Sequence, residues 1–295
     1  MKTMKQFIKL ITLAILVSLQ SCDKQEVEKD LSLNAIAPES GILPSELGSH
    51  NTTHNCATVS QFGPNSYWSN TLVNASETNF LKQQNNKASN LFGIANVPLY
   101  FAAGSGTFNA LSYGPPNNYI IWGEEMLSGA LNYGRSAVAY IVAHEVAHQI
   151  QFRQGYPSVT GASNTELEAD GFAGYFLRRS YTTNWSDVIP AYNFAQSIAG
   201  ANGSSHGTAA QRRSSVRLGW LLANNGALSN ANLDYNFFYY YNSYILPGKL
   251  RPSGEQKPKK IDEKLHEFML TKIEELNDIY TGKISEEEYA KLGNN

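Results

Sequence analysis

Two histidines that lie four residues apart in an apolar stretch, His144 and His148, have the spacing of metal ligands on a helix. Residues i and i+4 of an α-helix lie one above the other on the same face, so both imidazoles can reach one ion. Glu145 is rotated from His144 by about 100°, which places its carboxylate beside the ion, where it can take a proton from water. This His-Glu-x-x-His spacing is typical of zinc hydrolases and predicts metal-assisted hydrolysis.

A catalytic zinc needs a third protein ligand and an open position for water. Glu166 and Asp170 share one face of a second predicted helix, whereas Glu168 is about 200° away from Glu166. We assign Glu166 as the third ligand and Asp170 as the hydrogen-bond acceptor for the non-ligating nitrogen of a zinc-bound histidine. Glu168 is then expected to be a solvated surface residue. The alternative, with Glu168 as the ligand and Glu166 on the surface, is disfavoured by the same geometry.

The elements that position these residues can be predicted from the periodicity of apolar residues and from the turn residues between them. Helices are expected at residues 74–90, 136–154, 165–180 and 209–224. Strands are expected at 97–102, 108–113 and 119–122, the last two joined by a Gly-Pro-Pro-Asn-Asn turn. The predicted fold class is therefore α+β, with a small β-sheet next to a zinc-binding helix pair and a mostly helical C-terminal part.

The C-terminal part of the chain contains two further segments of interest. The aromatic run 233–246 (LDYNFFYYYNSYIL) is ambiguous between a buried helix and a strand. After a charged linker, residues 261–292 are expected to form one or two amphipathic helices. We expect their apolar stripe to pack on the body of the protein rather than to bind a partner. The stripe consists of Leu265, Phe268, Met269, Ile273 and Leu276.

The N-terminal segment 1–22 has basic residues, a short apolar run and a processing site, as in a secretory signal peptide. Its ending, Leu-Gln-Ser-Cys, resembles the lipobox of bacterial lipoproteins, which implies that Cys22 becomes the lipidated first residue. An ordinary signal peptide with an incidental cysteine is the alternative. We expect residues 23–60 to be a tether, 61–247 the domain that carries the zinc-binding helix pair, and 248–295 the charged linker with the C-terminal helices. The expected location is the bacterial cell envelope, lipid-anchored to the outer membrane or cell surface and extracytoplasmic.

The composition excludes some classes of function. The chain has 295 residues, a formal net charge of −2 and 16% charged residues, so a basic nucleic-acid-binding surface is not its main feature. Only two cysteines are present, Cys22 and Cys56, so no disulfide framework holds the fold together.

Three segments in this order resemble the bacterial neutral zinc metallopeptidase family and the related CAAX-prenyl-protease-type gluzincins. They are 144–148 (HEVAH), 165–170 (TELEAD) and 205–212 (SHGTAAQR), and the resemblance covers about residues 97–220. The resemblance implies a zincin-like fold and one zinc ion held by His144, His148 and Glu166, with Glu145 as the catalytic base and Asp170 beside a ligand. It also implies that His206 lines the cleft and stabilises the oxyanion, and that Arg212 braces this loop or pairs with a carboxylate. The chain departs from the prenyl-protease branch by having Gly207 in place of proline and by lacking multiple membrane helices, which argues against a prenylated substrate.

The expected function is that of a zinc-dependent metalloendopeptidase that hydrolyses extracytoplasmic polypeptides. The substrate is expected to pair along an edge strand of the sheet, either 108–113 or 119–122. The alternatives are a catalytically idle zinc-binding surface module and a lipoprotein that binds carbohydrate or protein, to which the aromatic run 233–246 could contribute.

Overall fold

In the computed structural model, the described residues are 53–55, 62–158, 161–199, 205–245 and 259–295. All of them belong to the unit Ala37–Asn295. The predicted signal peptide with Cys22, most of the predicted tether 23–60, Cys56, and the linker up to residue 258 lie outside the described residues. No helix in the described part of the chain is both long and apolar enough to cross a membrane.

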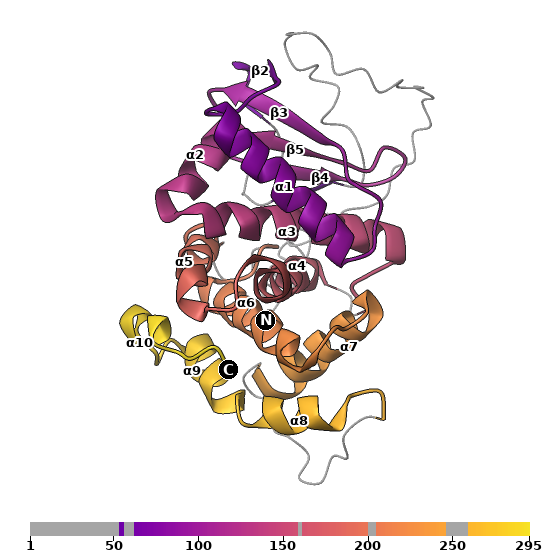
Figure 1. The fold of residues 1–295 in the computed structure, drawn as a ribbon, viewed down its shortest axis with the longest axis vertical. Helices are drawn as coiled ribbons and strands as arrows, with labels where there is room; N and C mark the ends of the chain where they lie inside the picture. Colours follow the sequence, from indigo (N-terminus) through magenta and orange to yellow (C-terminus); the bar gives the residue numbers. More distant parts are fainter. Residues whose placement is uncertain (1–52, 56–61, 159–160, 200–204, 246–258) are drawn as a thin grey trace, which may run out of the picture. The chain divides into compact units, whose positions relative to one another are not determined.

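A five-stranded mixed sheet lies at one end of this unit (Figure 1). Its strands are β1 (Thr53–Asn55), β2 (Ser66–Ser69), β3 (Leu99–Gly104), β4 (Ala110–Tyr113) and β5 (Tyr119–Gly123). The strand order is β1-β4-β5-β3-β2; β3 and β5 are parallel and the other pairs are antiparallel. Alternate residues of the central strands belong to two separate buried clusters, so the sheet is apolar on both faces.

The prediction that segment 108–113 or 119–122 forms an edge of the sheet is wrong. Strand β5 lies between β4 and β3, and β4 pairs on its other side with β1. The two edges are β1 and β2. The local sequence of a strand does not encode which distant segment pairs with it, and β1 lies more than fifty residues before β4 in the chain.

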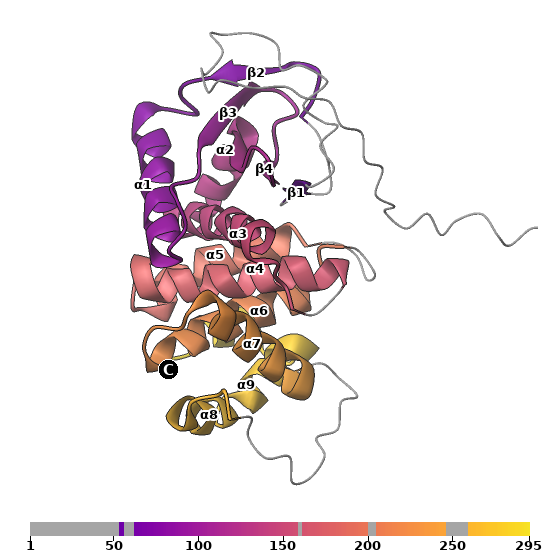
Figure 2. The ribbon, with the colours of Figure 1, turned by 90° about the vertical axis from the view of Figure 1, so that its right-hand side faces the viewer.

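Helices form successive layers below the sheet (Figure 2). α3 contacts strands β4 and β5 on one side and α4 on the other, α4 contacts α6, and α6 contacts α7 and α9. The α-helices are α1 (Ala75–Leu91), α2 (Glu124–Tyr133), α3 (Arg135–Gln154), α4 (Ala162–Phe176), α5 (Ile189–Ser197), α6 (Ala209–Leu222), α7 (Asn230–Tyr240), α8 (Glu263–Leu270), α9 (Ile273–Thr281) and α10 (Glu286–Ala290). Short π-helical segments, Leu177–Tyr181 and Tyr241–Ile245, extend α4 and α7, and single 3₁₀ turns cover Trp185–Val188 and Ala223–Asn225.

Helix α3 is buried along most of its length because apolar and small residues occur on all its faces. A helix that is apolar all round is stable only when other elements cover every side, and here the sheet, α1, α2 and α4 do so. The helix ends at Gly155, which adopts the left-handed conformation at φ 70°.

The aromatic run 233–246 is helical throughout its described part, in α7 and the π-helical segment that follows. Leu233, Phe237, Tyr240 and Tyr241 are buried in the main core. The C-terminal helices share this core through Leu265, Met269 and Leu276, which confirms the prediction that their stripe packs on the body. The α+β class is confirmed, whereas helices α2 and α5 were not predicted from the sequence.

Candidate metal centre

Three potential metal ligands lie together on the middle of α3. His144, Glu145 and His148 are fully buried, and each offers one ligand atom within 4.8 Å of the others. The Nε2 atoms of the two histidines are 3.1 Å apart, as the four-residue spacing on one helical face requires. This buried group could hold a metal ion.

Helix α4 adds the carboxylate of Glu166 to the same point. Its Oε2 atom is 3.4 Å from His144 Nε2, and its Oε1 atom is 3.6 Å from His148 Nε2. Ligands bonded at about 2.0–2.1 Å to one tetrahedral ion are about 3.3 Å from each other. The three separations are therefore close to those of a single tetrahedral metal site. Glu166 Oε2 is buried and makes no hydrogen bond, as expected of an atom whose partner is an ion.

The tautomers of the two histidines support the same conclusion. His144 Nδ1 is 2.9 Å from Asp170 Oδ1, and His148 Nδ1 is 2.7 Å from Gln151 Oε1. Both partners are acceptors, so each Nδ1 carries the proton and each Nε2 presents a lone pair. Two lone pairs and a carboxylate directed at one buried point repel one another unless a proton or a metal ion lies between them. The donor set therefore fits a metal ion.

Asp170 is the centre of a buried ionic network. Arg212 donates to both carboxylate oxygens, from Nε to Oδ2 and from Nη2 to Oδ1, each at 2.8 Å. Tyr140 also donates to Oδ1, and Arg212 Nη2 is 2.9 Å from the Tyr140 hydroxyl. Burial would raise the pKa of Asp170, but the charge of Arg212 and the hydrogen bonds from His144 and Arg212 outweigh it and hold the pKa below its usual value. Tyr140 was not predicted from the sequence, although it lies four residues before His144 and therefore on the same helical face.

The assignment of Glu168 as a solvated surface residue is wrong. Its side chain is fully buried, and its Oε2 atom accepts a hydrogen bond from Gln151 Nε2 at 2.8 Å. Glu168 does point away from Glu166, but α4 lies between α3, α6 and α7, so the opposite face of the helix is also covered. Burial and the neighbouring carboxyl of Asp234 raise the pKa of Glu168 well above its usual value. Gln151 was also missed, although it lies three residues after His148.

The sheet is attached to helix α3 by buried hydrogen bonds. Ser112 Oγ on β4 donates to the main-chain oxygen of Glu145 at 3.0 Å. Gln149 Nε2 on α3 donates in turn to Ser112 Oγ at 2.7 Å and to the Tyr113 oxygen at 2.9 Å. These bonds hold β4 in a defined register against α3, next to Glu145.

The loop before α6 brings His206 to the centre. His206 is 8% exposed, and its Nδ1 atom is 3.3 Å from Glu166 Oε2. Burial would raise the pKa of Glu166, whereas positive charge on His148 and hydrogen bonds from His144 and His206 lower it well below its usual value when these imidazoles are protonated. The next residue, Gly207, has φ +75°, a conformation closed to proline with its fixed negative φ. The absence of proline at this position thus has a local conformational reason.

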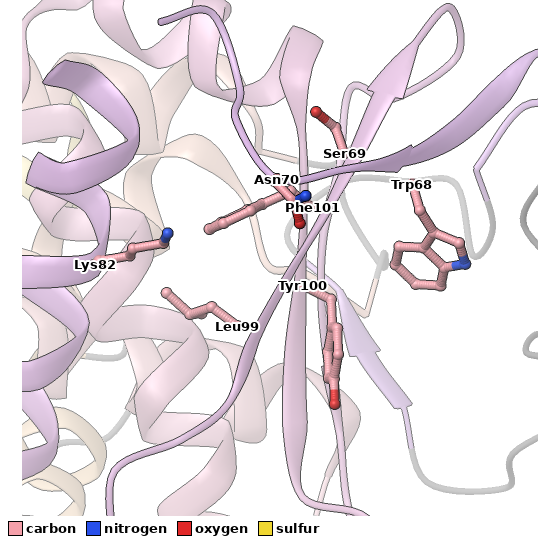
Figure 3. Close-up of a pocket in the computed structure, with 7 residues that line it drawn as sticks. All are labelled: Trp68, Ser69, Asn70, Lys82, Leu99, Tyr100 and Phe101. Atoms are coloured by element: carbon pink, nitrogen blue, oxygen red, sulfur yellow. The ribbon is translucent and has the colours of Figure 1, made fainter. Parts of the chain in front are cut away.

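A separate hollow of about 340 Å³ lies where α1 meets the edge of the sheet (Figure 3). Trp68 and Tyr100 line it together with Leu99 and Phe101, and Lys82 extends from α1 over the Phe101 ring. None of the predicted site residues lines this hollow, so we do not connect it with the chemistry at α3.

The structure thus brings together all the site residues predicted in the described part of the chain. His144, His148 and Glu166 converge on one point, Glu145 and His206 lie beside them, and Arg212 and Asp170 form the ionic support behind His144. Comparison of the chain with known protein families, with curated proteins and with solved structures finds no match.

Proposed function

We propose that the protein is a zinc-dependent metalloendopeptidase of the kind that its three motifs resemble, the bacterial neutral zinc metallopeptidases. The observation that carries the proposal is the convergence of two buried Nε2 atoms and the Glu166 carboxylate, with each histidine held at Nδ1 by an acceptor. Two histidines and a glutamate, with a second glutamate next to the first histidine, are the donor set and the base of zinc peptidases.

The chain's own residues would divide the chemistry among them. A bound zinc ion supplies a Lewis acid that polarises a carbonyl and makes water more acidic. Glu145 takes the proton of the attacking water on its carboxylate and then delivers it to the leaving amine. His206, beside Glu166, donates a hydrogen bond to the carbonyl oxygen as negative charge develops on it. Asp170 and Gln151 hold the two imidazoles in place.

The proposed substrate class and location rest on the N-terminal segment and the motifs of the sequence. We propose extracytoplasmic polypeptides as substrates and a lipid anchor at Cys22 that holds the enzyme at the cell envelope. The alternative function, a lipoprotein that binds carbohydrate or protein, was based on the aromatic run 233–246 as a possible binding surface. The described aromatic residues of this run are either buried in the main core or, like Tyr235, Tyr239 and Tyr244, half-buried against it, which weakens that argument.

The proposal is tested by metal analysis combined with peptide-bond cleavage. The purified protein should contain about one equivalent of zinc and cleave casein. Removal of zinc by a chelator should abolish cleavage, and added zinc should restore it. A protein without zinc, or casein cleavage that persists after the metal is removed, would contradict the proposed function.

A further inference from the structure

Gln151 and Glu168 form a chain of buried hydrogen bonds that ends at His148. The proposed mechanism does not require either residue to touch the substrate. Gln151 accepts from His148 Nδ1 through Oε1 at 2.7 Å. Its Nε2 atom donates to the main-chain oxygen of Thr165 and to Glu168 Oε2, both at 2.8 Å. Gln151 is 5% exposed and Glu168 is fully buried, so water has little access to these bonds.

The orientation of the Gln151 amide decides which nitrogen of His148 can bind a metal. An amide has a donor end and an acceptor end, and rotation by half a turn exchanges them. With the NH₂ group facing His148, Nδ1 would have to be the acceptor and the proton would move to Nε2. That tautomer has no lone pair at the metal position. The two histidines differ in this respect, because His144 is held by the Asp170 carboxylate, and both oxygens of a carboxylate accept.

The orientation of the amide is set from α4. Two acceptors, the Thr165 oxygen and Glu168 Oε2, lie on the side of Gln151 away from His148, so the NH₂ group must face them. Both residues lie in the first turns of the helix that carries Glu166. The packing of α4 on α3 thus brings in the third ligand and orients the second one.

We propose that Gln151 and Glu168 are positioning residues that hold His148 in the Nδ1-protonated tautomer and so make Nε2 available as a metal ligand. This inference rests on the metal site proposed above. Outer residues that orient a ligating histidine typically change metal affinity by 10–100-fold when they are replaced.

The test compares three substitutions by methionine, which fills nearly the same volume as glutamine or glutamate and has only a weak hydrogen-bond acceptor, its thioether sulfur. Gln151→Met and Glu168→Met should each lower zinc affinity by roughly 10–100-fold, measured by competition with a chromophoric chelator. Gln149→Met is the matched control, because Gln149 is also a buried amide on α3. Its hydrogen bonds go to Ser112 and Tyr113 of the sheet and do not fix the tautomer of either histidine. Its zinc affinity should stay within about threefold of wild type even if its stability falls. Glu168→Gln, which keeps an acceptor oxygen, should recover most of the affinity lost in Glu168→Met.

A second measurement reads the tautomer directly in the metal-free protein. Nitrogen NMR of the imidazoles should show His148 protonated at Nδ1 in the wild type and in Gln149→Met, and a substantial fraction protonated at Nε2 in Gln151→Met. Equal zinc affinities of Gln151→Met and Gln149→Met, or an unchanged His148 tautomer in Gln151→Met, would overturn the inference. A wild-type protein that binds no zinc would contradict the proposed function instead, while the tautomer measurement would still decide the role of Gln151. If Gln151→Met does not fold, Glu168→Met and Glu168→Gln provide the same comparison.

Discussion

Replacement of Asp170 by asparagine tests the buried network behind the candidate metal centre. Asp170 and Arg212 are both fully buried, and the carboxylate accepts from Arg212, Tyr140 and His144. The substitution keeps the size of the side chain but removes its charge. It also replaces one carboxylate oxygen by an NH₂ group, which must then face one of the donors that now bond to Asp170. Arg212 is then a buried cation whose counter-charge is lost.

The expected cost in stability is large. Breaking a buried ion pair by removing one partner typically destabilises a protein by about 3–5 kcal/mol. Because asparagine can still accept one hydrogen bond, we expect a loss near the lower end, about 3 kcal/mol in the free energy of unfolding. This corresponds to roughly a hundredfold increase in the unfolding equilibrium constant.

The measurement is urea unfolding of the metal-free protein, followed by the fluorescence of tryptophan. Removing the metal first separates the strength of the ion pair from the stability that ligand binding adds. Glu77→Gln is the control, since the ion pair of Glu77 with Arg135 is open to water, with side chains that are 16% and 51% exposed. Exposed pairs contribute less than about 1 kcal/mol.

A double-mutant cycle separates the pair from its surroundings. Asp170→Asn combined with Arg212→Met removes both charges, so the two losses should not add, and we expect a coupling energy of about 2 kcal/mol between them. The reasoning would be refuted if Asp170→Asn lost no more stability than Glu77→Gln, or if the two losses at Asp170 and Arg212 were additive.

Four further outcomes are expected. Glu145→Gln should keep about one equivalent of zinc but lose at least about a hundredfold in peptide cleavage, because only the proton acceptor is removed; wild-type-like cleavage would contradict the mechanism. Glu166→Ala should lose zinc, measured by metal analysis after dialysis; retention of zinc would argue against it as a ligand. Gly219→Ala should lose about 1–3 kcal/mol in urea unfolding, because a Cβ atom there would lie 1.8 Å from the main-chain oxygen of Gly171; unchanged stability would show that α4 and α6 can separate. Cys22→Ser should move the protein from the detergent phase to the aqueous phase, with cleavage retained; continued membrane association would refute a lipid anchor.

The faces of α3 and α4 that carry the candidate ligands were predictable because they depend on local periodicity. The four-residue spacing of His144 and His148 places both Nε2 atoms 3.1 Å apart once the segment is helical. The same spacing puts Glu166 and Asp170 on one face of α4, where the first approaches both histidines and the second reaches His144 Nδ1. The burial of the segment around these residues also follows from its composition, since helix α3 is apolar on all sides.

Contacts between segments distant in sequence were decided by the tertiary structure. A helical wheel shows that Glu168 points away from Glu166, but whether that direction meets water or another helix depends on the layers around α4. The same holds for the sheet, where β1 covers the side of β4 expected to be open, because backbone hydrogen bonding between strands depends little on side-chain identity. The sequence alone therefore determined which residues could bind a metal ion. Only the packing of α4 between α3, α6 and α7 determined which buried groups orient those ligands, because a hydrogen-bond partner is selected by position in space and not by distance along the chain.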